Sequence, residues 1–340
     1  MPSTTKTRLC LISDTHTLPP NPPTTSTGYR NPLPPSNILL HAGDITKVSY
    51  RIEHEAMISM LKSAPAELKL IIAGNHDISL DPGYFYSPAG SLHRPRRVNR
   101  DVIEDPEESP AEIRRLYTSP EAVEAGIRYL DEGSYTFRVP STGATLRVYA
   151  SPYQPEFCRW AFGYPRHVDR FNPPRPDLET ETGSGGARGK PENPVPDFPN
   201  VDVMLTHGPP MGILDETFRR GERVGCEHLL TAVKRARPRM HVFGHIHEAY
   251  GAGRMDWEVV KEGSDSVSGP ADAGAGFQGI KTDPEEVLEH RCAYHDASST
   301  GRPLRFGDET LFVNASVVTL RYQPLNAPWL VDLDLPVEET

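Results

Sequence analysis

Short, nearly continuous apolar runs recur along the chain, and polar, proline-rich stretches separate them. Runs of this kind are typical of β-strands that are covered on both faces, because neither face then needs alternating polar positions. The pattern predicts strands at the following positions: Arg8–Ser13, Asn37–His41, Leu68–Ala73, Thr145–Ala150, Val201–Thr206, Met240–Phe243, Thr310–Asn314 and Trp329–Leu333.

Helical spacing of apolar residues lies between several of these runs. Glu53–Lys62 and Glu227–Arg237 each carry their apolar residues on one side. A third helix is expected after Ser119, which suits an N-cap and is followed by Pro120 at the first helical position. The apolar residues of that helix would be Val123, Ile127 and Leu130. Strands that alternate with helices predict an α/β fold.

Three segments do not fit a compact core. Residues 17–35 are rich in proline and directly follow the first polar motif described below, so we expect them to border the functional site. Residues 171–199 and 253–307 are rich in glycine, proline or polar residues, and connections this long are uncommon in compact domains. We interpret 171–199 and 253–307 as loop insertions in a single domain that spans residues 1–340.

Composition and charge exclude several classes of protein. The apolar fraction is 37%, and the 35 prolines and 27 glycines among the 340 residues indicate long loops around an ordinary core. A net charge of −10 argues against a nucleic-acid-binding surface. The sequence shows neither an apolar signal region nor a run of ~20 apolar residues that could span a membrane. We therefore expect a cytoplasmic protein without a nucleic-acid or membrane partner, and the oligomeric state stays open.

Polar motifs begin where five of the apolar runs end. They are Asp14-Thr15-His16, Gly43-Asp44, Gly74-Asn75-His76-Asp77, His207-Gly208 and Gly244-His245-Ile246-His247. Asp, Asn and His suit divalent transition metals, and these motifs offer too many ligands for one tetrahedral zinc. Two metals that share one carboxylate would use them all, and paired metals are suited to displacement at phosphorus.

The spacing within the motifs favours a shared site. Asp14 and His16 are two residues apart, so both side chains point the same way from an extended strand end, and His245 and His247 repeat that spacing. A glycine directly before a polar residue lets the backbone turn sharply and approach closely. Sites in α/β sheets lie outside the carboxyl ends of the strands, where each motif is expected.

In this order the motifs resemble those of the calcineurin-like metallophosphoesterases. Longer matches resemble the metallophosphoesterase-domain-containing branch, close to the class III cyclic nucleotide phosphodiesterases. They are Leu40–Thr46, Ser151–Trp160, Thr206–Gly212, His241–Gly251, Asn314–Ser316 and Tyr322-Gln323-Pro324. The resemblance implies a four-layer αββα sandwich with long loop insertions. Some members of the branch have a glycine at one histidine of G-H-x-H and are weak catalysts, whereas this sequence keeps both histidines.

The resemblance also implies a ligand set for two divalent or mixed-valence transition metal ions, with Mn, Fe and Zn as the main candidates. The first ion would be held by Asp14, His16, Asp44 and His247. The second would be held by Asp44, Asn75, His207 and His245, with Asp44 as the bridge. The implied reaction is hydrolysis of a small phosphodiester, with cyclic nucleotides among the candidates, by a metal-bridging hydroxide. His76 would assist the leaving group, and Asp77 either orients His76 or is purely structural.

An aromatic cluster with one cation is the candidate substrate contact. Its members are Tyr153, Arg159, Trp160 and Phe162, which suit a base or another flat group, although a packing role is the alternative. His41 and His241, in or at the ends of apolar strands, are expected to form hydrogen bonds in the core and not to bind metal.

Three other functions stay open beside the phosphodiesterase. The centre could hydrolyse a phosphomonoester, or use the same metals for a non-phosphate reaction. The protein could also be a metal-binding scaffold. A scaffold would be expected to have lost ligands, and none is missing from the motifs.

Overall fold

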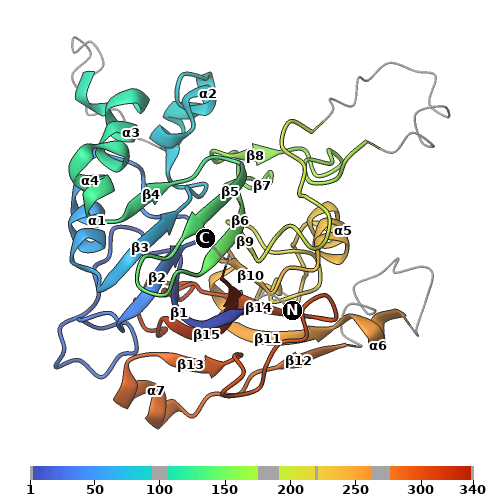
Figure 1. The fold of residues 1–340 in the computed structure, drawn as a ribbon. Helices are drawn as coiled ribbons and strands as arrows, with labels where there is room; N and C mark the ends of the chain where they lie inside the picture. The colour runs from blue at the N-terminus through green and yellow to red at the C-terminus, as the bar shows by residue number, and fades with distance from the viewer. Residues whose placement is uncertain (1–2, 94–105, 175–190, 219–220, 262–275, 338–340) are drawn as a thin grey trace, which may run out of the picture.

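Two β-sheets form the centre of the computed structural model, which describes residues 3–93, 106–174, 191–218, 221–261 and 276–337 (Figure 1). The first sheet has six strands in the order β13-β15-β1-β2-β3-β4. In chain order these are β1 (Thr4–Ile12), β2 (Ser36–His41), β3 (Ala66–Ile71), β4 (Ile127–Tyr129), β13 (Ala293–Asp296) and β15 (Trp329–Pro336).

The second sheet has seven strands in the order β12-β11-β14-β10-β9-β6-β5. They are β5 (Gly133–Arg138), β6 (Thr145–Ser151), β9 (Val203–Thr206), β10 (Met240–Phe243), β11 (Gly251–Asp256), β12 (Phe277–Gly279) and β14 (Glu309–Asn314). A separate short pair joins β7 (Gln154–Pro155) to β8 (Gly163–Tyr164).

Alternation along the strands divides the core into three parts. Leu9 and Leu11 of β1 face the second sheet, whereas Ile12 packs on the helices outside the first sheet. Val203 of β9 likewise joins the core between the sheets, and Met204 joins the core beneath the outer helix. Because strand side chains alternate with a period of two, each sheet buries both of its faces.

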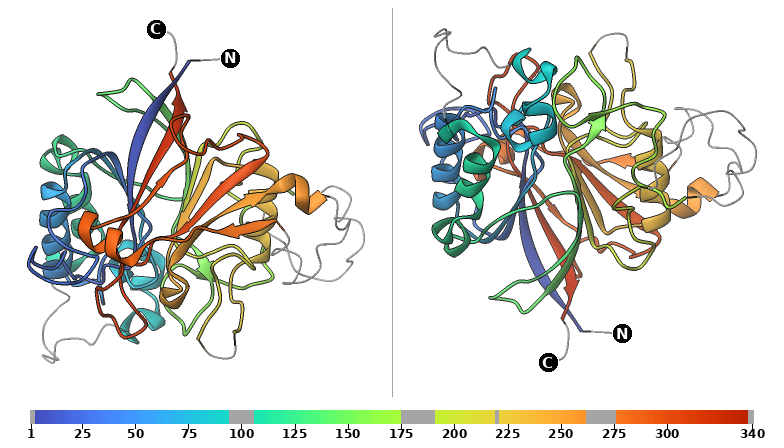
Figure 2. Two further views of the ribbon diagram at one scale, coloured as in Figure 1. Left: turned by 90° about the horizontal axis from the view of Figure 1, so that it is seen from below. Right: turned by 90° about the horizontal axis from the view of Figure 1, so that it is seen from above.

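Helices cover the two outer faces (Figure 2). The first sheet is covered by α1 (Arg51–Ser63), α3 (Pro110–Thr118) and α4 (Pro120–Glu124), and the second by α5 (Glu227–Ala236). The remaining helices are α2 (Pro82–Phe85), α6 (Trp257–Lys261) and α7 (Pro284–His290). Two sheets packed face to face, with helices on each outer side, give the four-layer αββα sandwich and confirm the predicted fold class.

The predicted strands are all present with small shifts at their ends, and the helices at 53–62 and 227–237 are confirmed as α1 and α5. The predicted helix after Ser119 is wrong beyond its first turn. Ser119 does cap α4 by accepting a hydrogen bond from the Ala122 backbone, but the helix ends at Glu124. Gly126 then adopts a φ of +82°, where a Cβ would meet the Glu67 carbonyl oxygen at 2.2 Å, and the chain turns into β4.

The segments interpreted as insertions lie partly outside the described residues, namely 175–190 and 262–275. The described part of 253–307 contains most of β11 together with β12 and β13, strands that the sequence pattern did not predict. Arg254 of β11 is buried, and its guanidinium donates to Glu309 at 2.7 Å. A buried ion pair therefore replaces an apolar residue at this position.

The carboxyl ends of the parallel strands meet at one edge of the sandwich. β1, β2 and β3 are parallel neighbours in the first sheet, and β9, β10 and β14 are parallel neighbours in the second. A bridge between Ser13 and Ser316 connects the two sheets at this edge, with the Val317 backbone N–H donating to the Ser13 carbonyl at 3.0 Å. No helix in the described residues is long and apolar enough to cross a membrane.

Candidate metal centre

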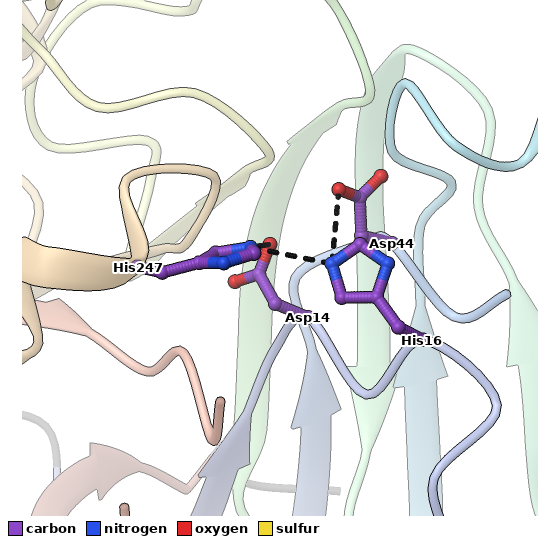
Figure 3. A group of neighbouring side chains, drawn as sticks. All are labelled: Asp14, His16, Asp44 and His247. Carbon is purple, nitrogen blue, oxygen red and sulfur yellow. Dashed lines mark hydrogen bonds and ion pairs between the residues drawn. The ribbon is translucent and has the colours of Figure 1, made fainter. Parts of the chain in front are cut away.

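Two groups of buried side chains lie at the edge where the parallel strands end. The first group consists of Asp14, His16, Asp44 and His247, shown in Figure 3, and the second contains Asp44, His207 and His245. Within each group the candidate ligand atoms all lie within 4.8 Å of one another. Asn75 lies beside the second group, with its Oδ1 3.0 Å from His207 Nε2. The structure thus brings all seven sequence-predicted ligands together, and Asp44 belongs to both groups.

The backbone at the site adopts strained conformations that the surrounding loops hold in place. Asp14, His16, Asp44 and His245 all have φ between 44° and 68°, in the left-handed region that non-glycine residues rarely adopt. Such strain persists only where neighbouring contacts enforce it, and it clusters at functional sites. Here the backbone N–H groups of Asp14 and His16 donate to the carbonyls of Gly43 and Asp44, each at 3.0 Å.

Glycine is required where these loops cross. A Cβ on Gly74 would meet the backbone nitrogen and the carboxylate of Asp44, both at 2.3 Å. One on Gly244 would meet the Asp14 carboxylate at 2.1 Å. The glycine before each of these motifs therefore allows the close approach that its position in the sequence predicts.

Backbone carbonyls orient two of the imidazole rings. Nδ1 of His16 lies 3.2 Å from the Thr46 carbonyl oxygen, and Nδ1 of His207 lies 2.9 Å from the Ala42 carbonyl oxygen. A carbonyl can only accept, so Nδ1 donates and Nε2 is the nitrogen that faces the centre. This arrangement is typical of metal-binding histidines, whose other nitrogen is held by a hydrogen bond.

The electrostatics of the centre favour a cation. Burial opposes ionisation of Asp14, but a hydrogen bond from His247 and the charges of His247 and His207 outweigh it and lower the Asp14 pKa to about 2. Burial also opposes ionisation of Asp44, and the charges of His207 and His76 nevertheless hold its pKa well below the usual range. Both carboxylates are therefore ionised at neutral pH although they are fully buried.

The histidines differ in protonation. Burial lowers the pKa of His16 and of His245 to about 3, so both rings are neutral, as metal ligands must be. Burial would also lower the pKa of His207, but the charge of Asp44 and a hydrogen bond to it raise the value to about 9. A positive charge is thus stabilised next to Asp44.

The donor set fits transition metal ions. Nε2 of His16 and Nε2 of His247 lie 3.2 Å apart, and each also lies close to a carboxylate oxygen. Because Nδ1 of His16 donates to the Thr46 carbonyl, Nε2 of His16 carries a lone pair. This lone pair can accept a hydrogen bond from a protonated His247 Nε2, or it can bind one cation together with a deprotonated His247 Nε2. Imidazole nitrogen with carboxylate and amide oxygen suits Mn, Fe or Zn, and the ligand types alone do not select among them.

His76 lies at the rim of the centre. Its backbone N–H donates to the Asp44 carboxylate at 2.8 Å, and its ring meets the His16 ring edge-on with centroids 4.7 Å apart. Nδ1 of His76 lies 2.7 Å from the Lys47 carbonyl oxygen, which leaves Nε2 as the nitrogen available to a substrate. The side chain is near the predicted ligands without belonging to either group.

Asp77 ties two motif loops together. Its carboxylate accepts from the backbone N–H groups of Ile45, Thr46 and Gly74 at 2.8–3.1 Å and from the Thr46 hydroxyl at 2.7 Å. These contacts fix the Asp44 loop on the Asn75 loop. The orienting contact of the His76 ring is instead the Lys47 carbonyl, so the observed contacts of Asp77 are those of the structural alternative.

The aromatic cluster predicted to contact substrate is only partly exposed. The ring of Phe162 is 5% exposed and packs in the core under the outer helices. Tyr153 is half-buried beneath the Arg170 guanidinium, which lies 3.6 Å from its ring centroid. Arg159 is exposed, and Trp160 stacks on His76 with centroids 4.0 Å apart. Among these four residues, Trp160 contacts His76, whose ring in turn contacts the predicted ligand His16.

Tyr322 is a site residue to which the sequence analysis assigned no role. Its ring lies 4.8 Å from that of His16 and 5.3 Å from that of His247, and it is 41% exposed. It adopts a φ of 57°, another strained position. The sequence signal was present, since Tyr322-Gln323-Pro324 contributed to the family resemblance, but nothing in its local pattern indicated a contact with His16 near the other end of the chain.

Known proteins with similar sequences include some with the name of the branch that the motifs resemble. No family model matches the chain. The chain is 29% identical over 340 residues to metallophosphoesterase domain-containing protein 1 of Homo sapiens and of Mus musculus, covering 97% of this chain and 72% of each relative. It is 30% identical over 262 residues to the probable rhamnogalacturonate lyase C of Emericella nidulans, a match that covers 76% of this chain but 19% of that protein.

Among solved structures, a crystal structure of a Thermus thermophilus protein aligns with a TM-score of 0.38 at 10% identity, covering 84% of this chain and 96% of that one.

Proposed function

Starting from the similarity of this chain to metallophosphoesterase domain-containing proteins over nearly its full length, we propose that it is a metal-dependent phosphoesterase whose substrate is a small phosphodiester. The observation that carries the proposal is the convergence of five separate motifs into two ligand groups that share Asp44. A scaffold with no reaction to perform has no need for two complete groups.

The residues of this chain would divide the work as follows. Asp14, His16 and His247 would hold one ion, and Asn75, His207 and His245 the other, with Asp44 between them. Bound divalent ions supply Lewis acidity and lower the pKa of coordinated water. The loops joined by Asp77 keep Asp44 and Asn75 in register, so the spacing of the two groups is set before any substrate arrives.

His76 would act on the substrate directly. With Nδ1 held by the Lys47 carbonyl, Nε2 is positioned to hold a proton near the oxygen that leaves phosphorus. General acid assistance of this kind contributes ~10²–10⁴-fold to a rate.

The charge of the centre supports an anionic substrate but does not discriminate between phosphodiesters and phosphomonoesters. Two divalent ions bring more positive charge than Asp14 and Asp44 neutralise, so the loaded centre attracts phosphate although the chain has a net charge of −10. A phosphomonoester carries more negative charge than a diester, and that favours the phosphomonoesterase alternative. The proposed diester preference rests on the family resemblance and on the exposed aromatic rings at the rim, Phe157 and Tyr322, which could contact a second ester group.

The test combines metal analysis with a substrate screen. Purified protein loaded with Mn²⁺ should hold two ions per chain and show a higher kcat/KM for an aryl phosphodiester than for the matching monoester. Cyclic nucleotides form the third arm of the screen. Faster turnover of the monoester would make the protein a phosphatase. Two bound ions without turnover of any phosphate ester would refute the phosphoesterase and favour a non-phosphate reaction or a scaffold.

A further inference from the structure

The loop of residues 156–162, which we call the aromatic loop, carries a tryptophan that stacks on His76. We infer that Trp160 is a positioning residue that fixes the His76 ring, and not a surface on which substrate stacks. The inference rests on the proposed function, because it assigns Trp160 a role through His76.

The ring geometry carries the inference. The Trp160 and His76 rings are stacked with centroids 4.0 Å apart and an interplanar angle of 27°. On its other face Trp160 stacks on His93, at 3.7 Å and 12°. Both faces of the indole are therefore covered by imidazole rings. A flat substrate group needs an open face, so Trp160 cannot receive one in this arrangement.

The His76 ring would have freedom to turn without this stack. Its Nδ1 contact with the Lys47 carbonyl fixes one point of the ring, and rotation about that contact would swing Nε2 away from the centre. The His16 ring meets His76 edge-on at 4.7 Å and limits rotation on one side. The flat face of Trp160 limits it on the other.

The aromatic loop is built to hold Trp160 in place. Three non-glycine residues, Cys158, Arg159 and Phe162, have φ between 49° and 59°, which is an unusual concentration of left-handed backbone. The short pair of β7 and β8 closes the base of the loop, where Gln154 Nε2 donates to the Ala161 carbonyl at 2.9 Å. Strain of this kind persists only when the surroundings over-determine the conformation.

The chain segment that follows His76 supplies the contacts that enforce this conformation. The Asp81 carboxylate accepts from the Phe162 backbone at 2.9 Å, and the Tyr84 hydroxyl donates to the Arg159 carbonyl at 2.6 Å. His93 Nε2 donates to the Cys158 carbonyl at 2.9 Å while its ring supports Trp160. The segment that carries His76 thus also holds the aromatic loop in the conformation that places Trp160 against His76.

A double-mutant cycle tests this coupling with the Mn²⁺-loaded protein and an aryl phosphodiester. Trp160→Ala should lower kcat by about 10- to 100-fold, since misplacement of a reacting group by about 1 Å costs on that order. KM and metal content should stay within about twofold, because substrate binding is not the function lost. In a His76→Ala background the same substitution should change kcat by less than about twofold, because the two residues act as one unit.

Phe157 provides the matched control in the same loop. Its ring is 56% exposed and approaches His245, at 5.9 Å, and not His76. Phe157→Ala should therefore change kcat by the same factor in the wild-type protein and in the His76→Ala background. Trp160→Phe keeps a flat face and should recover most of kcat, which guards against loss of activity through misfolding of the alanine variant.

Fluorescence gives a readout independent of turnover. The chain has three tryptophans, and Trp257 and Trp329 are buried elsewhere in the core. The emission of Trp160, obtained as the difference between the wild-type protein and Trp160→Phe, should change in His76→Ala and in His93→Ala if the stack exists in solution.

Three outcomes would overturn the inference while leaving the proposed function intact. In the first, Trp160→Ala and His76→Ala change kcat independently of each other. In the second, the main effect of Trp160→Ala is a rise in KM. In the third, the emission of Trp160 is the same in His76→Ala and in His93→Ala as in the wild-type protein. Absence of phosphate-ester turnover by the wild-type protein would instead remove the proposed function, and the fluorescence result would still decide whether Trp160 and His76 are stacked.

Discussion

The two sheets bring different ligands to the same edge of the sandwich. The loops that follow strands of the six-stranded sheet carry Asp14, His16, Asp44 and Asn75. The loops that follow strands of the seven-stranded sheet carry His207, His245 and His247. All carboxylate ligands therefore come from one sheet, and the other contributes imidazole ligands alone. His76 also comes from the six-stranded side.

The two sheets therefore contribute differently to metal binding: one supplies the carboxylates that attract a cation, and the other supplies imidazoles that complete its coordination. Carboxylates carry the charge that draws a cation into a buried place, and Asp44 does so for both groups. A histidine must be neutral to bind a metal, so the imidazoles of the second sheet would complete the coordination without adding charge. We therefore expect loss of the shared Asp44 carboxylate to damage both metal positions and loss of a histidine of the second sheet to damage one.

The largest effect should follow replacement of the shared carboxylate. Asp44→Ala should lose both ions and all measurable turnover, whereas His245→Ala should keep the ion of the first group. Metal analysis of both variants after dialysis against the same dilute Mn²⁺ buffer measures the difference. Retention of one ion by Asp44→Ala, or loss of both by His245→Ala, would break the proposed division between the sheets.

A smaller but still large effect is expected at His76. His76→Ala should lower kcat by ~10²–10⁴-fold while both ions stay bound, because the ring acts on the reacting ester and not on the metal. Steady-state kinetics and metal analysis of the same preparation give the answer. If metal content fell with kcat, His76 would be a ligand and the six-stranded sheet would supply one more than assigned.

Tyr322 connects the contributions of the two sheets. It lies in the loop after β14 of the second sheet, and its ring packs on His16 of the first. Tyr322→Ala should lower kcat/KM by about tenfold, on the order of 1.4 kcal/mol, through loss of that packing. Tyr322→Phe keeps the ring and should differ from the wild type only if the hydroxyl contacts substrate. Equal losses in the two variants would assign the effect to the hydroxyl.

The smallest effect concerns stability, where the sheets are alike. His41 of the first sheet contacts the Thr15 hydroxyl at 2.9 Å, and His241 of the second contacts the Thr206 hydroxyl at 2.8 Å. Burial lowers the pKa of His41 to about 4 and that of His241 to about 3. Both are hydrogen-bonding core histidines, as predicted, and both stay neutral in the folded protein at mildly acidic pH.

The sign of the pH effect follows from proton uptake. Below about pH 6.5 the unfolded chain protonates these histidines and the folded chain does not, so the free energy of unfolding of the metal-free protein should fall from about pH 6.5 to about pH 4. Burial and the charge of Asp44 raise the Asp77 pKa to about 6. Below that pH the folded chain binds one proton at Asp77 that the unfolded chain does not, and this partly offsets the loss of stability. Urea unfolding at several pH values measures the slope, and His241→Gln should reduce it. A rise in stability on acidification would contradict the assignment.

The sequence predicted the parts of this molecule that depend on local pattern. Apolar runs located the strands, and the polar residues that end them located the ligands, because parallel strands present their carboxyl ends at one edge. The glycines at 74 and 244 were interpretable because the close approach they permit is a backbone property. The same local pattern was wrong at β4, where apolar spacing indicated a helix but Gly126 turned the chain into a strand.

Contacts between distant loops were not predictable in this way. The Lys47 carbonyl holds His76, yet a backbone oxygen has no signature in the sequence. The sequence predicted Trp160 as a substrate contact, but the two imidazoles that cover it belong to a segment more than 60 residues earlier. Sequence pattern therefore identified which residues form the site, and the structure was needed to show which of them contact one another.

The antiparallel pairing of β1 with β15 joins the beginning and the end of the chain, from Thr4 opposite Pro336 to Leu11 opposite Trp329. It places the first and last described residues side by side, with the Val337 backbone N–H donating to the Ser3 carbonyl at 2.8 Å (Figure 2). A short linker could therefore connect them, and new ends could be opened in the exposed stretch at residues 281–283. In such a circular permutant β15 would directly precede β1, so the pairing of these two strands would become a local hairpin. Lower contact order should then make it fold faster than the natural chain order allows, with the Asp14 motif still following its strand.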